Sequence, residues 1–202
     1  MTKGWNILED LARRSGGTFK AGDATKAGVH PRDLYAWRDE GYLVGLSRGV
    51  FRLASAEMSP YLDLVAVSRR SLQGAICLNS ALSFWDLTDE VPCEVHLAVP
   101  RGAHRPSIDY PPTRVHVFAA VTFPLGREKV QLESDEEITI YSPERSVVDA
   151  MRLRNQVGTD VAYEALRRYL RRPGASTGNL LGLARRLRSG GPVRDALQVL
   201  TG

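Results

Sequence analysis

Four residues suited to molecular recognition fall between positions 31 and 40. Arg32, Tyr35, Ala36 and Asp39 recur at intervals of three or four, so on a helix they share one face. The face combines a forked donor, an aromatic hydroxyl, a small residue and an acceptor. Arginine pairs with guanine edges in the major groove of DNA, and short side chains permit close approach. The pattern predicts a helix that reads the major groove, with docking onto another protein as the alternative.

Further polar residues flank this segment. His30 directly precedes the predicted helix, where its ring could cap the helix or contact a phosphate. Ser47 and Arg48 occupy a turn bounded by glycines, and Arg52 follows shortly after. We expect this turn to contact phosphates or the minor groove. The predicted DNA-binding residues are therefore His30, Arg32, Tyr35, Ala36, Asp39, Ser47, Arg48 and Arg52.

The C-terminal part of the chain holds a second concentration of positive charge. Residues 145–202 contain 11 basic and 4 acidic side chains, and every basic one is arginine. Guanidinium groups favour bidentate contacts with phosphate or carboxylate. We expect a second basic surface that faces nucleic acid or an acidic protein; the alternative is that these arginines pair with the acidic middle of the chain. The residues are Arg145, Arg152, Arg154, Arg167, Arg168, Arg171, Arg172, Arg185, Arg186 and Arg188.

Residues for enzymatic chemistry are sparse. The chain has no glycine-rich phosphate loop, no His-Glu-x-x-His and no Gly-x-Ser-x-Gly. His96 and His116 alternate within predicted strands, which favours places on a sheet face over metal binding. In the segment SPERSVVD, residues 142–149, Ser142 can cap a helix and Asp149 can hold neighbouring basic groups, which predicts a structural role. We expect no catalytic residue, no cofactor and no metal.

The predicted recognition residues need elements that hold them in place. Hydrophobic periodicity predicts helices over 4–14, 21–27 and 31–40, a short extended piece at 18–19, and a hairpin built from 42–44 and 50–53. Leu34 and Trp37 share the apolar face of the third helix. Gly28 and Val29 make a tight turn between the second and third helices. This order of elements predicts a winged helix-turn-helix.

A small polar segment, residues 55–59, reads as a linker between a DNA-binding domain at 1–54 and a second domain at 60–202. The second domain combines predicted helices and strands and ends in a helical tail. The predicted fold class is α+β: an N-terminal winged helix-turn-helix, then a mixed α+β domain with a helical C-terminal tail. The predicted helices are 60–72, 76–87, 143–155, 160–172, 177–188 and 193–200, and the predicted strands are 95–99, 115–118, 128–132 and 138–141.

Composition narrows the class of protein. With 43% hydrophobic and 25% charged residues, the chain of 202 residues has the composition of a globular protein. No apolar run approaches the roughly 18 residues that span a bilayer, and the N-terminus has no signal core, so we expect a cytoplasmic protein without a membrane partner. Net charge is +3 over 1–54, −6 over 55–144 and +7 over 145–202. Basic ends favour a polyanionic partner.

Several stretches resemble a known family. The string AGVHPRDLYAWRDEGYLVGLSRGVFRL is similar to the winged-helix domain of AbiEi-type antitoxins, the repressor partners of type IV toxin–antitoxin systems. NSALSFWDLTDEVPCEVHLAVPRGAHRP and IYSPERSVVDAMRLRNQVGTDVAYEALRRYLRR are similar to that family's C-terminal domain. His30 departs from the family, in which Ser or Thr is the commoner cap, and Val44 and Gly45 are less basic than usual. The matching winged-helix positions are Leu34, Gly41, Leu43, Arg48, Gly49, Val50 and Leu53.

The resemblance implies an autorepressor that binds inverted repeats in its own promoter. Such a site would take two copies of a chain that is a monomer in solution. The C-terminal domain would counter a cognate nucleotidyltransferase-like toxin without forming a stable complex with it. Two alternatives stay open: an antitoxin whose second domain enzymatically modifies the toxin or its product, and an ordinary winged-helix regulator with a ligand-sensing domain.

Overall fold

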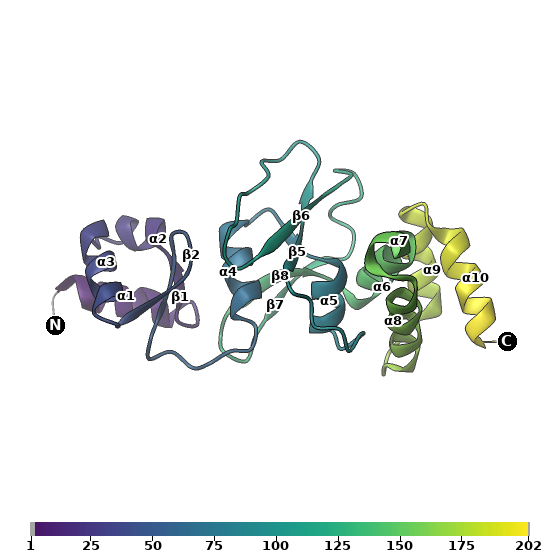
Figure 1. The fold of residues 1–202 in the computed structure, drawn as a ribbon, viewed down its shortest axis with the longest axis horizontal. Coiled ribbons are helices and arrows are strands. Elements are labelled where there is room, and N and C mark those ends of the chain that lie inside the picture. Colours follow the sequence, from purple (N-terminus) through teal and green to yellow (C-terminus); the bar gives the residue numbers. More distant parts are fainter. Residues whose placement is uncertain (1–2, 202) are drawn as a thin grey trace. The chain divides into compact units, whose positions relative to one another are not determined.

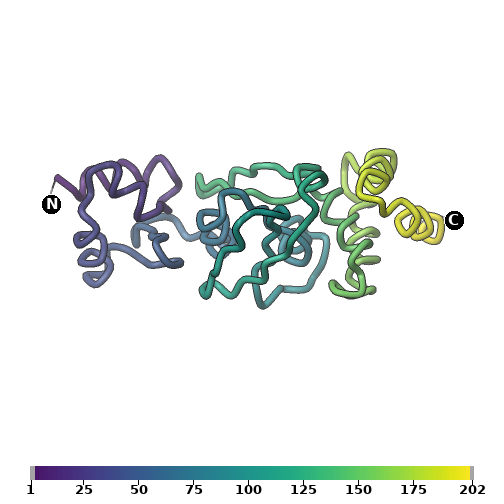
Figure 2. The backbone as a smooth tube through the Cα atoms, turned by 90° about the horizontal axis from the view of Figure 1, so that it is seen from above, coloured from purple at the N-terminus to yellow at the C-terminus, as the bar shows by residue number. Residues whose placement is uncertain are grey.

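The computed structural model describes residues 3–201 and divides them into two compact units. The first unit contains the chain up to Leu72 together with Pro106–Thr113 and Lys129–Thr139. The second contains Gln73–Arg105, Arg114–Glu128 and the chain from Ile140 onward. The unit that holds the N-terminal helices thus extends beyond the predicted boundary near residue 54. The division into a DNA-binding domain at 1–54 and a second domain at 60–202 stays a prediction. Figures 1 and 2 follow the course of the chain.

Three helices and a small sheet form the N-terminal part of the first unit (Figure 1). The sheet is antiparallel, with strand order β1-β3-β2, and the hairpin β2–β3 contains an irregular pairing between Gly45 and Ser47. Gly49 has a φ of +69°, which glycine adopts without steric cost, at the turn between these strands. The elements are α1 Lys3–Arg13, β1 Thr18–Lys20, α2 Ala21–Lys26, α3 Pro31–Asp39, β2 Leu43–Ser47 and β3 Val50–Leu53.

The start of α3 follows from its sequence. Pro31 occupies the first turn, where its missing N–H has no intrahelical partner to lose. His30 caps the helix, because its Nδ1 accepts a hydrogen bond of 3.1 Å from the backbone N–H of Arg32. Leu34 is buried, and the rings of Trp5 and Trp37 meet edge to face at 5.1 Å. These contacts hold α3 on α1 and leave its opposite face exposed.

A five-stranded sheet has the order β6-β5-β4-β8-β7. β4 is antiparallel to β5 and parallel to β8, where Ile76 pairs with Ile140. Sequence periodicity missed β4 because its two residues adjoin the apolar start of a helix. The elements are α4 Leu62–Arg70, β4 Ala75–Ile76, α5 Leu78–Phe84, β5 Val95–Pro100, β6 Thr113–Phe118, β7 Arg127–Gln131 and β8 Glu137–Tyr141.

Helices complete the second unit. Residues 143–155, predicted as one helix, form α6 and α7, which are separated at Leu153. α6 packs against α5, α8, α9 and α10 around one buried apolar cluster, and Figure 1 shows these helices together. The α+β prediction is confirmed. No helix among the described residues is long and apolar enough to cross a membrane. The helices are α6 Pro143–Arg152, α7 Arg154–Val157, α8 Thr159–Arg171, α9 Thr177–Arg186 and α10 Gly190–Thr201.

Candidate nucleic-acid interface

The outward face of α3 presents the predicted recognition residues. Arg32, Tyr35, Ala36 and Asp39 are all exposed. Tyr35 keeps 48% of its surface exposed while the edge of its ring meets Phe51 at 5.9 Å. The phenol is therefore supported from below and free at its outer side. The structure places these four side chains together on one exposed surface of the helix.

Sequence reasoning missed Arg38 on the same helix. Its Nε and a terminal nitrogen donate hydrogen bonds of 2.9 and 2.7 Å to Oδ1 of Asp39. Its guanidinium also lies 5.1 Å from the centre of the Tyr35 ring. Asp39 is thus already engaged by a neighbour and is a weaker acceptor for a base than its sequence position indicated. Arg38 lies three residues after Tyr35, so helical spacing was the signal that could have found it.

The β2–β3 hairpin carries Arg48 at its turn. The Arg48 side chain is exposed, and no carboxylate among the described residues lies within ion-pair distance of it. Its backbone oxygen accepts a 3.1 Å hydrogen bond from Arg70, which also donates at 3.2 Å to the backbone oxygen of Ser107. Ser47 is half-buried. Arg70, which the sequence did not single out, thus ties the turn to α4.

Arg52 is not available to DNA, which corrects its predicted role. Its side chain is almost fully buried and forms an ion pair with the buried carboxylate of Glu136. One terminal nitrogen also donates to Gly16 and Thr18, and the other donates to the backbone oxygen of Glu57. A buried charge is tolerated only when it is paired and hydrogen-bonded. Glu136 lies 84 residues further along the chain, so local sequence could not reveal the pair.

Arg145 also has to be removed from the predicted second basic surface. It is fully buried, and its Nε donates a 2.8 Å hydrogen bond to Oδ2 of Asp149. Arg152 binds the other oxygen of Asp149 at 2.8 Å and is partly exposed. Burial raises the pKa of Asp149, and both guanidinium groups oppose that rise. The motif SPERSVVD thus contains an enclosed ion pair and, at Ser142, a helix cap.

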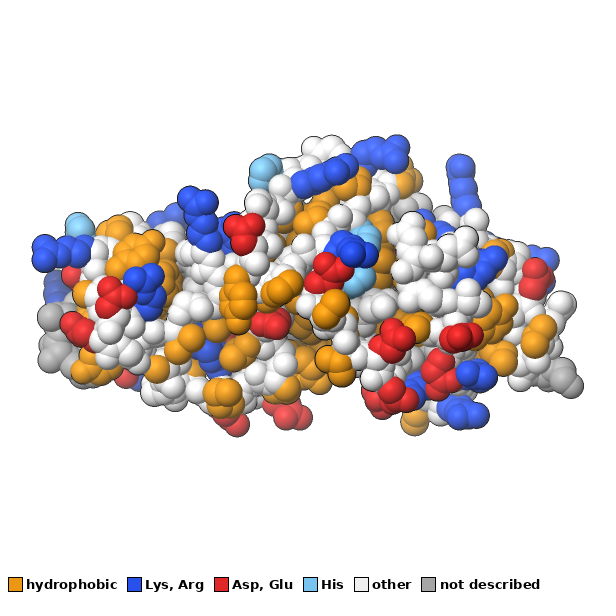
Figure 3. All heavy atoms as spheres, in the orientation of Figure 1, with side chains coloured by type: hydrophobic (Ala, Val, Ile, Leu, Met, Phe, Trp, Pro, Cys, Tyr) orange, Lys and Arg blue, Asp and Glu red, His pale blue; other side chains and the backbone are white. Residues whose placement is uncertain are grey.

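The arginines of α8 are largely paired with carboxylates. Arg167 and Arg168 both bind Glu164, and their hydrogen bonds lower the pKa of Glu164. Arg168 also pairs with Asp89. Acidic and basic side chains adjoin one another over the helical part in Figure 3. Arg168 thus pairs with the acidic middle of the chain at Asp89, as the alternative proposed, whereas Arg167 pairs with Glu164 of its own helix.

The remaining arginines of the predicted surface differ in their surroundings. Arg172 donates to the backbone oxygen of Trp85, and Arg154 donates at 3.1 Å to that of Met151. Four others are exposed, and none of them forms an ion pair with a described residue: Arg171, Arg185, Arg186 and Arg188. The exposed arginines that remain free of ion pairs with described residues in the predicted surface are therefore these four. Arg152, Arg154 and Arg172 are partly exposed.

Three helices, a tight turn before the third and a β-hairpin give residues 3–53 the order of elements that is typical of a winged helix-turn-helix. Residues 6–54 match the family model described as "Transcriptional regulator, AbiEi antitoxin", so this part of the chain is similar to AbiEi-type regulators. The resemblance seen in the sequence is confirmed there.

The chain is also similar to a solved structure. The RV2827C protein from Mycobacterium tuberculosis has a crystal structure similar to this chain, with a TM-score of 0.51 and 16% sequence identity. The similarity covers 95% of this chain and 79% of that one. No curated protein matches the sequence significantly. At this identity the likeness concerns the fold alone, and it extends beyond the residues that the family model matches.

Proposed function

We propose that the protein is a transcriptional autorepressor and antitoxin that binds duplex DNA through α3 and the β2–β3 turn. The observation that carries the proposal is the exposed recognition face of α3. There Arg32, Tyr35 and Ala36 stand clear of the core, while Leu34 is buried beneath them. A helix that is firmly packed on one side and polar on the other is the element that helix-turn-helix proteins place in the major groove.

Each exposed side chain has a distinct part in this proposal. Arg32 reads a guanine edge, because its guanidinium can donate to O6 and N7 together. Ala36 lets the helix backbone approach the bases. Arg38, whose charge is paired with Asp39 and whose guanidinium lies over the Tyr35 ring, holds that ring in place beside them. Arg48 binds a backbone phosphate from the wing.

The proposed biological role rests on the similarity of residues 6–54 to AbiEi-type regulators. We infer that two copies bind an inverted repeat in the protein's own promoter and repress transcription from it. The C-terminal domain counters a nucleotidyltransferase-like toxin without a stable complex. The exposed arginines at 171, 185, 186 and 188 provide a positive surface for nucleic acid during either task. The protein works in the cytoplasm, where its DNA is.

The proposed contact between α3 and DNA is tested by measuring the affinity of the protein for a duplex that contains the region upstream of its own reading frame. Arg32→Ala should weaken binding by about 5- to 150-fold, the usual effect of losing one bidentate base contact. Tyr35→Ala should add to that loss. Arg13→Ala is the matched control, because Arg13 is an exposed arginine on α1, outside the proposed face. Wild-type affinity in the Arg32→Ala, Tyr35→Ala double variant would exclude this placement.

A further inference from the structure

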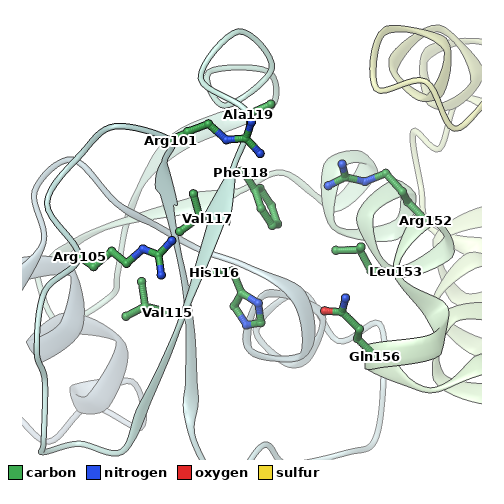
Figure 4. A pocket seen from close by; sticks show the side chains of 10 residues that line it. All are labelled: Arg101, Arg105, Val115, His116, Val117, Phe118, Ala119, Arg152, Leu153 and Gln156. Carbon is green, nitrogen blue, oxygen red and sulfur yellow. The ribbon is translucent and has the colours of Figure 1, made fainter.

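The second unit contains an open cavity of about 500 Å³. Figure 4 shows His116 and Phe118 on β6 at its centre, Arg101 and Arg105 on one side, and Arg152 and Gln156 on the other. Arg101 directly follows β5, and its backbone N–H donates a 2.8 Å hydrogen bond to the oxygen of Phe118. The cavity is thus assembled from a strand, a loop and the helices α6 and α7.

The charge of this cavity is not balanced locally. Three arginines line it, and none of the described residues around it is acidic. Arg101 and Arg105 are exposed, and within the described chain neither has a carboxylate at ion-pair distance. Arg152 shares the single carboxylate of Asp149 with Arg145. The cavity therefore presents a net positive charge.

Arg152 is held in position at the cavity wall. Its guanidinium lies 5.3 Å from the centre of the Phe118 ring, and one terminal nitrogen is fixed by Asp149. Its Nε is buried and has no hydrogen-bond partner among the described residues. Buried N–H groups almost always have a partner, which can be a bound water or ion. The Arg152 side chain as a whole keeps 30% of its surface exposed, and Figure 4 shows its guanidinium directed into the cavity, where its terminal N–H groups can meet an anion.

The other polar groups can recognise a ligand without adding charge. The rings of His116 and His96 are stacked, and Nε2 of His116 lies 3.1 Å from Nδ1 of His96. Burial, His96 and Arg114 lower the pKa of His116 to about 4, so the ring is neutral at neutral pH. Gln156 contributes an amide, and Leu153 adds apolar surface. The wall thus combines positive charge with neutral and apolar surface.

We propose that this cavity binds the phosphate group of a small ligand of the size of a mononucleotide. Arginine forks match phosphate oxygens bidentately, and two forks face a third across the cavity. The volume lies within the range of about 300–1,000 Å³ that is typical of small-molecule sites and exceeds the needs of inorganic phosphate. The site lies in the other compact unit from α3 and its wing. It is a function separate from the proposed operator binding.

The test is calorimetric titration of the full-length protein with AMP, ATP and inorganic phosphate, without added metal. We expect saturable binding of AMP or ATP. The double variant Arg101→Ala, Arg105→Ala should weaken it at least tenfold, because both side chains are exposed and their removal leaves the core intact. Arg194→Ala is the matched control, since Arg194 is an exposed arginine of α10 and does not line the cavity. Thermal unfolding of each variant verifies that it is folded.

Each other result would overturn the proposal. One such result is the absence of saturable binding by all three probes, and another is unchanged binding in the double variant. Inorganic phosphate that binds as tightly as AMP would exclude recognition of a nucleotide-sized ligand. If the double variant lost affinity only for the promoter duplex while no free nucleotide bound, the arginines would belong to the DNA interface instead. This last measurement distinguishes the phosphate of a free nucleotide from the phosphates of DNA.

Discussion

At the scale of single residues, Arg145 is a buried charge in the second unit that needs a carboxylate partner to remain stable. Its charge is fully enclosed, with Asp149 at 2.8 Å and the backbone oxygens of Thr122 and Leu125 at 2.8 and 2.7 Å. Asp149→Asn removes the only carboxylate that is paired with this cation in the described chain. We expect the free energy of unfolding to fall by about 3–5 kcal/mol, because an uncompensated buried charge remains.

Chemical denaturation measures this change. Asp195→Asn, at an exposed carboxylate of α10, is the control and should stay within about 0.5 kcal/mol of the parent protein. An unchanged unfolding midpoint for Asp149→Asn, combined with loss of antitoxin activity, would point to a chemical role for the carboxylate in place of the structural one.

His96 and His116 make a second prediction at this scale. Burial is the main cause that lowers the pKa of both rings, Arg114 lowers both further, and Glu94 opposes this for His96. In the unfolded chain each ring returns to its ordinary value of 6.5. Because the folded values are lower, the unfolded state binds more protons below pH 6.5. The stabilisation from the neutral pair is therefore complete above pH 6.5 and is lost as the pH falls towards 4.

This dependence is measurable by denaturation at a series of pH values. The double variant His96→Gln, His116→Gln should lose less stability than the parent between pH 6.5 and 4. Carboxylates titrate in the same window, so the difference between the two proteins is the relevant quantity. Parallel stability curves would show that the two rings do not contribute.

At the scale of elements, the β2–β3 wing and its turn give a prediction about salt. Arg48 is exposed at a turn that Arg70 anchors through a backbone contact. If Arg48 binds a phosphate, Arg48→Ala should weaken specific and non-specific DNA alike. The slope of log affinity against log salt should become shallower by about one, the counterion release of one contact. Titrations at several salt concentrations measure this slope, and an altered sequence preference at an unchanged slope would assign Arg48 to base recognition.

Elements with strong periodicity could be predicted from the sequence, and those defined by distant partners could not. The helix at Pro31 follows from local signals: a proline in its first turn, Leu34 on its buried face, and exposed Tyr35. β4 was not predicted because a strand of two residues is too short to show an alternation of apolar and polar side chains. Its pairing with β8 also depends on Ile140, which lies far along the chain.

The candidate site divides in the same way. Exposure of Arg32, Tyr35 and Arg48 could be inferred from spacing and from the glycine-bounded turn. The burial of Arg52 and Arg145 could not be inferred, because the sequence does not show whether the fold brings a carboxylate into contact with an arginine. Only tertiary structure brings Glu136 to Arg52, whereas the partner of Arg145 lies four residues away, and the sequence did predict that Asp149 holds neighbouring basic groups.

At the scale of the whole molecule, the arginines separate into two groups with different expected behaviour. Reversing the exposed, unpaired group (Arg171, Arg185, Arg186 and Arg188) to glutamate should weaken promoter binding and reduce the salt slope, with little change in melting temperature. Reversing Arg167 and Arg168 should instead lower the melting temperature, because both are paired with carboxylates. If the first group lowered stability without altering the salt slope, its arginines would serve the fold alone.

The Arg52–Glu136 pair also bears on how the molecule is made. A ribosome adds about 5–20 residues per second, so Glu136 is synthesised roughly 4–17 s after Arg52. During that interval a nascent chain has all three strands of the N-terminal sheet but lacks the carboxylate that pairs with Arg52 of β3. The first unit, which includes Lys129–Thr139, therefore lacks part of its chain until those residues have been synthesised. A messenger that ends between the codons for Arg52 and Glu136 would yield a chain with α3 and the β2–β3 hairpin, but Arg52 would have no carboxylate partner in it.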